Sequence, residues 1–395
     1  MEHTDFITLI KVIAAELYEK NIGYHFIEST ALIIQGLELD SCNEINVLIQ
    51  WDQFETTHNM YEEYFPTEIK KGNSRAEFQL NRAGYSIVFT CLYNIAIKAD
   101  PYRVLLTIDN TDVWSQSLYT YLFDENSVYK EKIHCFLLKK QEEITSHNES
   151  AWNQNNYLAL LNRYGEPHQT AMKIKQNPKW RLHPFYKYMG DVEGKQIVHL
   201  LGSNGIKGTA LALLGANVTI VDFSKENQRF ALEVAKEAGV EISYIITDVL
   251  SVLESSITTN NDIVLMELGV LHYFIDLSPL AKVVAQLLKK DGMFILHEFH
   301  PISTKLITSS GKKHKVTGNY FDPTIHTKDV AFTKHMSNDE KGSLAKVLQR
   351  YWTLGEIVTA LAREGLYVHI LEEEPNHKLH DIGLPKTFTI CAKKA

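Results

Sequence analysis

Short apolar segments alternate regularly with helical ones over the second half of the chain. The intervening helices are expected, for example, at residues 207–214 and 225–238. Repeated strand–helix–strand units form a parallel sheet with helices on its faces, because each crossover brings the chain back alongside the preceding strand. Two later segments, residues 367–371 and 386–392, are expected to close the sheet as a hairpin. The five alternating strands are expected at residues 196–201, 217–222, 241–247, 262–267 and 293–299.

The N-terminal part of the chain has a different pattern. Helices are expected at residues 5–20 and 30–35, and strands at residues 24–27, 45–51 and 85–92. A polar segment at residues 141–150 is interpreted as the end of a linking helix. With 395 residues the chain is long enough for two domains. We therefore expect a smaller α/β or α+β domain at residues 1–145 and a larger α/β domain at residues 146–395.

The composition is that of an ordinary globular protein, with 45% apolar and 22% charged residues. The formal net charge of −8 argues against nonspecific binding to DNA, RNA or an anionic membrane, because these partners need clustered Lys and Arg. The N-terminus shows no basic start followed by an apolar core, and no apolar run approaches the roughly 20 residues of a membrane span. We therefore expect a cytoplasmic protein without a nucleic-acid or membrane partner.

The cysteines give no sign of a disulfide framework or a zinc site. Cys42, Cys91, Cys135 and Cys391 are widely scattered, with no C-x-x-C pair and no tight cluster with histidine. Both kinds of site need close, recurring spacings of their ligands or partners. We therefore expect no metal-binding residues.

The most informative stretch of the chain is residues 197–222. An apolar strand ends there in a tight Gly-Ser-Asn-Gly loop at residues 202–205, which opens into a helix. Glycine lets the backbone turn sharply and lets a ligand lie against the main chain, and amide groups at a helix N-terminus can hold the polar end of that ligand. The next strand ends in Asp222, whose carboxylate is placed to accept both hydroxyls of an adenosine ribose.

Two further acidic residues follow the next strands of the expected sheet. Asp248 comes after the third strand, and Glu267 ends the fourth. Since α/β sheets bind ligands at the carboxyl ends of their strands, these residues and Asp222 are expected to surround a ligand crevice. The alternative is a tight turn without a ligand, because a lone glycine-rich turn is weak evidence. A nicotinamide dehydrogenase would need G-x-G-x-x-G, a register that this loop does not give.

Residues 150–395 resemble the class I S-adenosylmethionine-dependent methyltransferases. The resemblance rests on the loop, on the acidic strand ends and on the closing segments at residues 352–356, 362–366 and 373–375. It implies a Rossmann-like, seven-stranded, mostly parallel sheet with S-adenosylmethionine as the cofactor. It assigns cofactor binding to Leu201, Gly202, Ser203, Asn204, Gly205, Asp222, Phe223, Asp248, Val249, Glu267 and Leu268.

The first strand departs from the pattern of this family. The family usually carries an acidic residue there, followed by three alternating glycines, D-x-G-x-G-x-G. In this chain His199 stands at the acidic position, and Leu201 and Ser203 stand at the first two glycine positions. The contact that the family makes to the amino group of the methyl donor is therefore expected to be lost or moved. Variant loops occur in a branch of the family, so the resemblance still implies cofactor binding.

Methyl transfer from a sulfonium needs few catalytic groups, because the donor is already activated. The enzyme aligns donor and acceptor, excludes water and in some cases removes a proton. His272 and His300 are the candidate bases, since both are expected just past a strand's carboxyl end and a histidine can accept a proton near neutral pH. The alternative is that each only hydrogen-bonds within a pocket wall. Residues 297–300 are not an H-E-x-x-H zinc motif, because the spacing is one residue short.

The segment at residues 300–350 is longer than an ordinary loop. Tyr320, Phe321 and residues 302–307 are apolar and aromatic enough to form a lid over a small-molecule pocket. The chain lacks the N/D-P-P-Y/F tetrad that amino-methylating nucleic-acid enzymes of this class carry after the fourth strand. The methyl acceptor is therefore expected to be a small molecule, and the sequence leaves a homodimer open.

The N-terminal domain, over roughly residues 6–121, resembles the nucleotidyltransferases. That family shows a G-G/S turn, a short helix and then D-x-D on a strand, whose carboxylates hold magnesium on a nucleoside triphosphate. Here Glu28 stands at the first glycine, the acidic pair reads Glu44-Ile45-Asn46, and the strand at residues 85–90 offers no third acid. The resemblance therefore implies a non-catalytic relative, and a plain core without a ligand remains the alternative.

The sequence thus predicts an S-adenosylmethionine-dependent methyltransferase that acts on a small-molecule acceptor and carries a nucleotidyltransferase-like domain. Two other functions remain open. One is a non-catalytic protein that binds S-adenosylmethionine and regulates another process. The other is a bifunctional enzyme in which Glu44 still supports nucleotide transfer.

Overall fold

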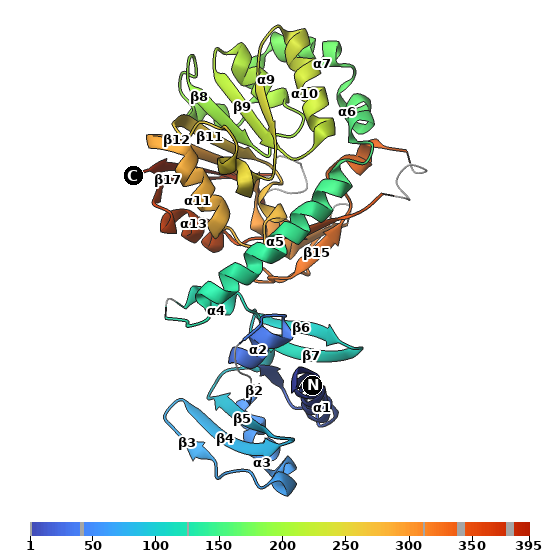
Figure 1. The fold of residues 1–395 in the computed structure, drawn as a ribbon, viewed down its shortest axis with the longest axis vertical. Helices are drawn as coiled ribbons and strands as arrows, with labels where there is room; N and C mark the ends of the chain where they lie inside the picture. The colour runs from blue at the N-terminus through green and yellow to red at the C-terminus, as the bar shows by residue number, and fades with distance from the viewer. Residues whose placement is uncertain (1, 40–42, 125, 311–312, 338–343, 377–382) are drawn as a thin grey trace. The chain divides into compact units, whose positions relative to one another are not determined.

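The computed structural model describes the chain except for residues 1, 40–42, 125, 311–312, 338–343 and 377–382. It divides into two compact units (Figure 1). The N-terminal unit comprises Met1–Phe136 and Phe321–Pro323, and the C-terminal unit comprises Leu137–Tyr320 and Thr324–Ala395. The division falls inside helix α5 (Lys130–Trp152), nearer the N-terminus than the boundary expected around residue 145.

A seven-stranded sheet forms the centre of the C-terminal unit, in the order β10-β9-β8-β11-β12-β18-β17. Strands β8 to β12 run parallel, and β18 is antiparallel to both β12 and β17. The expected Rossmann-like α/β sheet with a closing hairpin is confirmed. Its strands are β8 (Gln196–Leu200), β9 (Asn217–Asp222), β10 (Ser243–Ile246), β11 (Asn261–Glu267), β12 (Leu288–Phe299), β17 (Leu366–Pro375) and β18 (Pro385–Lys394).

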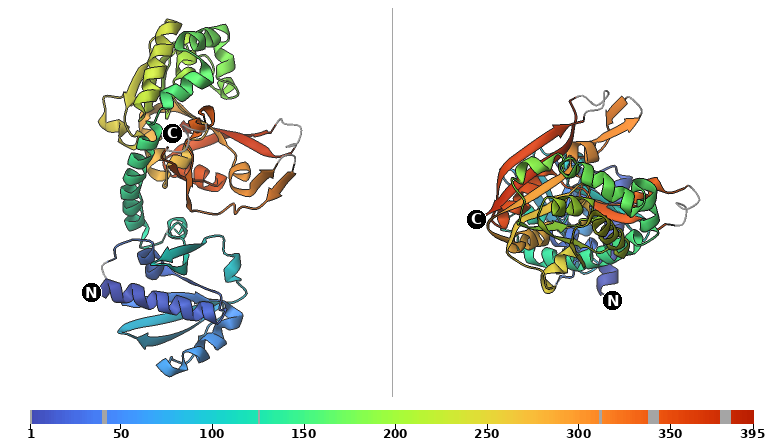
Figure 2. Two further views of the ribbon diagram at one scale, coloured as in Figure 1. Left: turned by 90° about the vertical axis from the view of Figure 1, so that its right-hand side faces the viewer. Right: turned by 90° about the horizontal axis from the view of Figure 1, so that it is seen from above.

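Helices cover both faces of this sheet (Figure 1 and Figure 2). Because alternate residues of a strand point to opposite faces, Ile197 and Leu265 join a core with α7, α9 and α10. Their neighbours Val198 and Val264 join a second core with α11 and α13. The helical segments are α6 (Asn156–Tyr164), α7 (Pro167–Gln176), α8 (Pro178–Arg181), η4 (Phe185–Tyr188), α9 (Ile206–Leu213), α10 (Lys225–Ala238), η5 (Val249–Glu254), η6 (Leu271–Tyr273), α11 (Ser278–Leu287) and α13 (Leu354–Arg363).

Helix α10 illustrates why the sequence forms these elements. Phe230, Val234 and Ala238 recur every four residues and are all buried, which is the spacing of a helix with one apolar face. The Ser224 side chain caps the first turn. Gly239 ends the helix in the left-handed conformation that glycine adopts readily. The helix is therefore fixed between β9 and β10, and its start lies beside Asp222.

The segment at residues 300–350 has regular structure of its own. It begins with a short π-helix, η7 (Ile302–Leu306), and continues into a hairpin of β13 (Ile307–Ser310) and β14 (Lys313–Val316). Strand β15 (Ile325–Lys328) then pairs with β16 (Val347–Arg350), and η8 (Ala331–His335) lies between them in the chain. The segment also contributes four side chains to a small buried apolar cluster: Val330, Phe332, Met336 and Val347.

The N-terminal unit is built around a second seven-stranded sheet, in the order β3-β4-β5-β2-β1-β7-β6. The sheet is mixed, since β1 is antiparallel to β2 and β2 is parallel to β5. The sequence predicts β1, β2 and β5 but not the other four strands. The elements are α1 (Glu2–Glu19), β1 (Tyr24–Phe26), α2 (Glu28–Ile34), β2 (Glu44–Ile49), η1 (Trp51–Gln53), α3 (Phe54–Met60), η2 (Glu62–Tyr64), β3 (Lys70–Lys71), β4 (Arg75–Arg82), β5 (Tyr85–Leu92), η3 (Ile97–Ala99), β6 (Arg103–Ile108), β7 (Thr111–Gln116) and α4 (Thr120–Phe123).

Membrane-spanning helices are not found among the described residues, because none of their helices is both long and apolar enough. Helix α5 has 23 residues, which is long enough to cross a bilayer. Its sequence, however, carries charged pairs such as Lys139-Lys140 and Glu142-Glu143.

Candidate active site

The loop after β8 keeps a tight turn although two of its glycine positions carry side chains. Leu201 and Ser203 adopt left-handed backbone angles, with φ of 49° and 46°, a region that side chains make costly. Space explains the glycine between them: a Cβ on Gly202 would lie 2.7 Å from Ile220 Cγ2 and 2.9 Å from the His199 ring. A side chain at Gly202 would thus force Ile220 or His199 to move.

Asp222, the last residue of β9, ties this loop to the start of α10. Its carboxylate accepts hydrogen bonds from the backbone N–H of Ser203 (3.1 Å) and of Ser224 (2.8 Å). The side chain of Asn227 is a third donor, at 3.4 Å. Burial raises the pKa of Asp222 to about 6, although these three hydrogen bonds oppose the shift.

A pocket, called the first pocket here, opens at the carboxyl ends of β8, β9 and β10. Five of the residues predicted to bind the cofactor lie in its wall: Leu201, Asp222, Phe223, Asp248 and Val249. Asp248 also caps η5 by accepting the Leu250 N–H at 3.2 Å. Burial raises the pKa of Asp248 as well. Two carboxylates therefore face one partly apolar cavity.

Helix α5 supplies a wall of the first pocket that the sequence analysis missed. Gln141, Thr145 and Asn148 line the pocket. Gln141 donates to the Tyr273 carbonyl at 2.9 Å and accepts the Ile275 N–H at 2.8 Å. The three side chains are spaced as i, i+4 and i+7, which places them on one helix face. That spacing was the available signal, and it was hidden in a segment interpreted as a linker.

The remaining predicted cofactor residues lie beside the first pocket rather than in its wall. The Asn204 side chain accepts the Ile206 N–H at 3.1 Å, and Gly205 adopts a left-handed φ of 70°. Glu267 forms an ion pair with Lys207 of α9, a residue that the sequence analysis did not select. Leu268 is 39% exposed and donates its N–H to the His297 carbonyl at 2.7 Å.

A second pocket lies on the other side of η6. His272 contributes to its wall, between the rings of Tyr273 (4.5 Å between centroids) and Tyr351 (5.9 Å). Burial lowers the pKa of His272 to about 3, so its imidazole is neutral at pH 7. The lining residues are Leu271, His272, Glu298, Phe299, Pro301, Thr304, Tyr351, Trp352 and Ile357.

Glu298 shapes this second pocket through the backbone. Its carboxylate accepts the N–H groups of Gly269 (2.6 Å), Val270 (2.8 Å) and Leu271 (3.2 Å). Trp352 holds the same turn by donating its indole N–H to the Leu271 carbonyl at 3.0 Å. These bonds fix η6, and with it the position of the His272 ring.

His300, the other candidate base, is 1% exposed and engaged at both nitrogens. Its Nε2 lies 2.6 Å from Glu373 Oε1, and its Nδ1 accepts the Ile302 N–H at 3.1 Å. Since Nδ1 is an acceptor, Nε2 carries the proton and donates to Glu373. This geometry favours the structural alternative for His300, because neither nitrogen is left for a bound molecule.

The two aromatic residues predicted to form a lid, Tyr320 and Phe321, belong to different units of the chain. The Tyr320 hydroxyl accepts the Leu354 N–H at 3.2 Å, whereas Phe321 belongs to the N-terminal unit. The apolar cluster of Val330, Phe332, Met336 and Val347 packs with Tyr273 and Trp152, and Leu201 lies against it. Within the C-terminal unit, the segment at residues 300–350 therefore packs against side chains of the first pocket as well as contributing Pro301 and Thr304 to the second.

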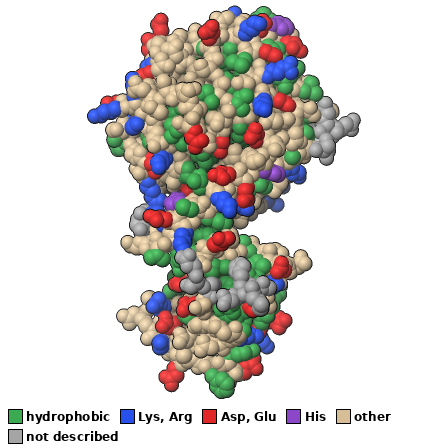
Figure 3. Space-filling view, in the orientation of Figure 1, with side chains coloured by type: hydrophobic (Ala, Val, Ile, Leu, Met, Phe, Trp, Pro, Cys, Tyr) green, Lys and Arg blue, Asp and Glu red, His purple; other side chains and the backbone are tan. Residues whose placement is uncertain are grey.

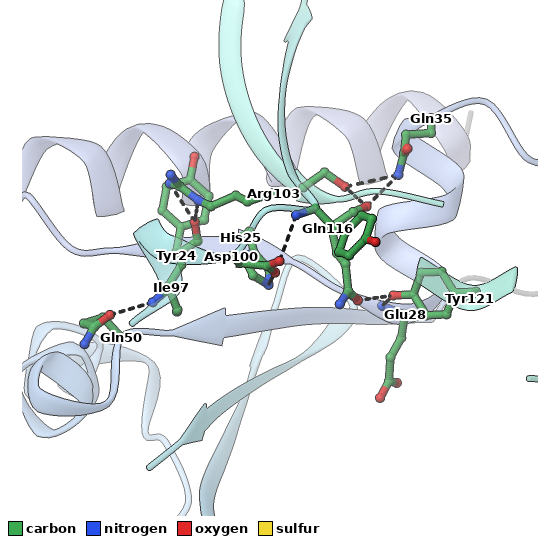
Figure 4. A network of polar contacts seen from close by, with 12 residues as sticks. Tyr24, His25, Glu28, Gln35, Gln50, Ile97, Asp100, Arg103, Gln116 and Tyr121 are labelled. Carbon is green, nitrogen blue, oxygen red and sulfur yellow. Dashed lines mark hydrogen bonds and ion pairs between the residues drawn. The ribbon is translucent and has the colours of Figure 1, made fainter. Parts of the chain in front are cut away.

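Among the residues that the structure describes, the acidic positions Glu28 and Glu44 of the N-terminal unit belong to no metal-binding group. Glu28 begins α2 with a left-handed φ of 54°, and its backbone N–H donates to the Tyr121 hydroxyl. Figure 4 shows this hydroxyl donating in turn to Gln116, at 2.8 Å. Glu44 is exposed and pairs in register with Ser86 of β5. Among the described residues, no group of three or more His, Cys, Asp or Glu side chains is arranged to hold a metal ion.

Residues 201–296 match the sequence model of a methyltransferase-domain family. The matched range begins at the loop after β8 and includes Asp222, Asp248 and Glu267 at the strand ends. The chain carries a methyltransferase domain. It is an S-adenosylmethionine-dependent enzyme, and the loop and strand ends described above belong to the matched part of this methyltransferase domain.

Several solved structures are similar to part of the chain. An S-adenosylmethionine-dependent methyltransferase from Listeria monocytogenes is 20% identical, with a TM-score of 0.44, and covers 55% of this chain and 98% of its own. One from Mesorhizobium loti is 19% identical, with a TM-score of 0.42, and covers 56% and 100%. Magnesium protoporphyrin IX methyltransferase from Synechocystis is 14% identical, with a TM-score of 0.39, and covers 62% and 97%. No curated protein matches the chain.

The side chains of the first pocket fit the adenosine part of S-adenosylmethionine. Asp222 and Asp248 offer carboxylate oxygens, which accept hydrogen bonds from ribose hydroxyls and from the adenine amino group. Leu201, Val249 and Phe274 supply apolar surface for a flat base. When bound, the cofactor supplies a methyl group on a positively charged sulfur, which needs no further activation.

Proposed function

We propose that the methyltransferase domain methylates a small-molecule acceptor bound in the second pocket. One observation carries this proposal: consecutive residues of η6 line the two pockets. Tyr273 lies in the wall of the first pocket and His272 in the wall of the second. A cofactor in the first pocket and an acceptor in the second would therefore be close neighbours, as methyl transfer requires.

The second pocket suits an acceptor with an aromatic or apolar body and one hydroxyl or amine. Phe299, Tyr351 and Trp352 give it aromatic walls. His272 is neutral at pH 7 and forms no hydrogen bond to the described residues, so its nitrogen lone pair is available to accept one from the acceptor. Glu298 is not available for this role, because its carboxylate already accepts four backbone N–H groups, from Gly269, Val270, Leu271 and Phe299.

A small molecule fits this surface better than a nucleic acid does. Acidic and basic side chains are interspersed over the face drawn in Figure 3, where the described residues form no continuous basic patch. The net charge is −8. Nucleic-acid binding depends on neutralising many phosphates with clustered Lys and Arg.

Methyl transfer to a panel of small hydroxyl and amine compounds tests this proposal. Once an acceptor is found, His272→Ala is expected to lower kcat by up to about 10-fold, because it removes one hydrogen bond that orients the acceptor, while leaving S-adenosylmethionine affinity unchanged. His369→Ala, an exposed histidine of β17, is the matched control. Equal turnover by His272→Ala and wild type would remove His272 from the reaction. Transfer only to a nucleic acid would contradict the proposal itself.

We also propose that the N-terminal unit is a non-catalytic relative of the nucleotidyltransferases. The mixed sheet places Glu44 at the start of β2, in register with Ser86 of β5, and Asn46 stands at the second position of the acidic pair. A site with one carboxylate and one amide binds magnesium poorly. The full chain is therefore expected to consume no nucleoside triphosphate with magnesium. Consumption that Glu44→Gln abolishes would support the bifunctional alternative instead.

A further inference from the structure

A charged pair stands at the point where the strand order of the methyltransferase sheet reverses. Strands β9 and β10 lie on one side of β8, and β11 and β12 lie on the other. Ligands of open α/β sheets bind in the crevice at the carboxyl ends of the strands at such a point. Lys207 lies in the first turn of α9, just after the loop that follows β8, and Glu267 is the last residue of β11. Both side chains therefore lie at this crevice.

The pair is largely withdrawn from water. The side chains of Lys207 and Glu267 are 21% and 15% exposed and bond directly to each other. The Lys207 ammonium also lies 5.3 Å from the centre of the Phe185 ring. Burial lowers the pKa of Lys207 to about 7. Removing two charges from water offsets much of their attraction, so a buried ion pair is weak evidence of a purely stabilising role.

His199 lies beneath this pair and does not compete for its charges. The side chain is 1% exposed, and its Nε2 is 4.0 Å from Glu267 Oε1. Neither ring nitrogen has a hydrogen-bond partner among the described residues. Burial lowers the pKa of His199 to about 3, so the ring is neutral. A neutral imidazole in this place gives no negative charge to a bound ammonium group.

The chemistry of the cofactor supplies the complement to this pair. Its adenosine half matches the first pocket, where Asp222 and Asp248 lie. Its other half is an amino acid, which carries one ammonium and one carboxylate group. The loop of residues 201–205 is bonded to Asp222 through the Ser203 N–H and leads into α9, where Lys207 pairs with Glu267. A side chain of each sign is therefore available close to this loop.

We propose that Glu267 and Lys207 hold the amino-acid end of the methyl donor. The Glu267 carboxylate binds the donor's ammonium, the Lys207 ammonium binds the donor's carboxylate, and the ion pair between the two side chains opens as the donor enters. Glu267 then takes the place of the acidic residue that is His199 in this chain. The charges of the donor's amino-acid group are balanced, because one ion pair between the side chains is exchanged for two ion pairs with the donor.

This assignment predicts a selectivity for ligands that carry the amino-acid group. S-adenosylhomocysteine has that group, whereas 5′-methylthioadenosine has the same adenosine half without it. Glu267→Gln leaves Lys207 to repel the donor's ammonium. The substitution therefore weakens the binding of S-adenosylhomocysteine but not that of 5′-methylthioadenosine. Charge-assisted hydrogen bonds contribute about 1.5–3 kcal/mol, which corresponds to an affinity change of about 10-fold or more.

Calorimetric titration of both ligands into the full chain tests the proposal. Wild type is expected to bind S-adenosylhomocysteine more tightly than methylthioadenosine, and Glu267→Gln to weaken the first by about 10-fold or more while leaving the second within a factor of about two. The double variant Glu267→Gln with Lys207→Gln removes both charges, so neither is left unpaired in the fold. It is expected to bind the two ligands with nearly equal affinity. Glu254→Gln, an exposed acid of η5, is the control.

Three results would overturn the proposal. The first is unchanged S-adenosylhomocysteine affinity in Glu267→Gln. The second is an equal loss of affinity for both ligands in the double variant, since the substitutions would then not act on the amino-acid end of the ligand. The third is a wild-type chain that binds neither ligand, which would overturn the cofactor assignment together with this proposal. None of these results depends on the methyl acceptor, so they are separate from a failure of the small-molecule proposal.

Discussion

The two pockets on either side of η6 are built in different ways. The first pocket is made mostly from strand ends and the turns that follow them, such as Asp222 and Asp248. The second collects side chains from three distant stretches of chain, around residues 271, 299 and 351. Regular alternation places strand ends along one edge of a sheet, so the first kind of site can be read from sequence. The second pocket cannot be predicted in this way, because it depends on how the long segment before β16 brings residue 351 close to residues 271 and 299.

The largest effect is expected at the loop that borders the first pocket. A Cβ on Gly205 would clash with the Cβ of Ala231, and φ is 70°. Gly205→Ala is therefore expected to lower the free energy of unfolding by about 2–4 kcal/mol, combining overpacking with left-handed strain. Denaturant unfolding measures this. Gly239→Ala is the matched control, because its φ is 73° but its Cβ would meet nothing within 4 Å, so only about 1 kcal/mol is expected. Equal losses at both positions would show that close packing of the loop is unimportant.

A smaller effect is expected where α5 joins the first pocket to η6. Gln141→Leu leaves the Tyr273 carbonyl and the Ile275 N–H without their buried partner. Such unsatisfied groups cost about 1–3 kcal/mol, so both stability and cofactor affinity are expected to fall. Calorimetry and thermal unfolding are the measurements, and Ser146→Ala, on the exposed side of the same helix, is the control. Unchanged cofactor affinity would show that α5 is only a connector, as the sequence suggested.

The sequence locates the two carboxylates that line the first pocket but not the wall that α5 supplies. Asp222 and Asp248 follow apolar strands, so periodicity alone locates them. Gln141 stands in a polar segment, and its two backbone partners lie more than 130 residues away along the chain. His272 and His300 look alike in sequence for the same reason. They differ in the structure because His300 is hydrogen-bonded to Glu373 of β17, which lies 73 residues further along the chain.

Lowering the pH gives the smallest effect, and in the first pocket it acts through Asp222. Because the pKa of Asp222 is about 6, the ionised carboxylate that accepts the ribose hydroxyls is lost as pH falls below that value. Cofactor affinity is therefore expected to drop by about tenfold between pH 7 and pH 5. Calorimetry at the two pH values measures this, and Asp222→Asn should remove the dependence. A flat profile in wild type would exclude Asp222 as the titrating group.

The raised pKa of Asp222 also makes folding stability depend on pH, and stability changes in the direction opposite to cofactor affinity. A carboxyl group whose folded pKa lies above its ordinary value favours the protonated form in the fold. Its contribution to stability is therefore present at low pH and is lost as pH rises from about 4 to about 6. Unfolding of the ligand-free wild type over this pH range measures the contribution, and Asp222→Asn, which does not titrate, is expected to remove this pH dependence although it also loses an acceptor for the Ser203 or Ser224 N–H. The same pH dependence in wild type and variant would contradict the raised pKa of Asp222.

The central claim is that the strand ends of the C-terminal unit bind S-adenosylmethionine although the glycine loop departs from the family pattern. The most direct measurement is calorimetric binding of S-adenosylmethionine and S-adenosylhomocysteine to wild type and to Asp222→Ala, with the exposed Asp191→Ala as control. The account predicts micromolar binding that Asp222→Ala weakens by about 10-fold or more and Asp191→Ala does not, because paired hydrogen bonds to a carboxylate are lost. Absence of binding by the wild type would contradict it, and would mean that Leu201 and Ser203 have closed the site.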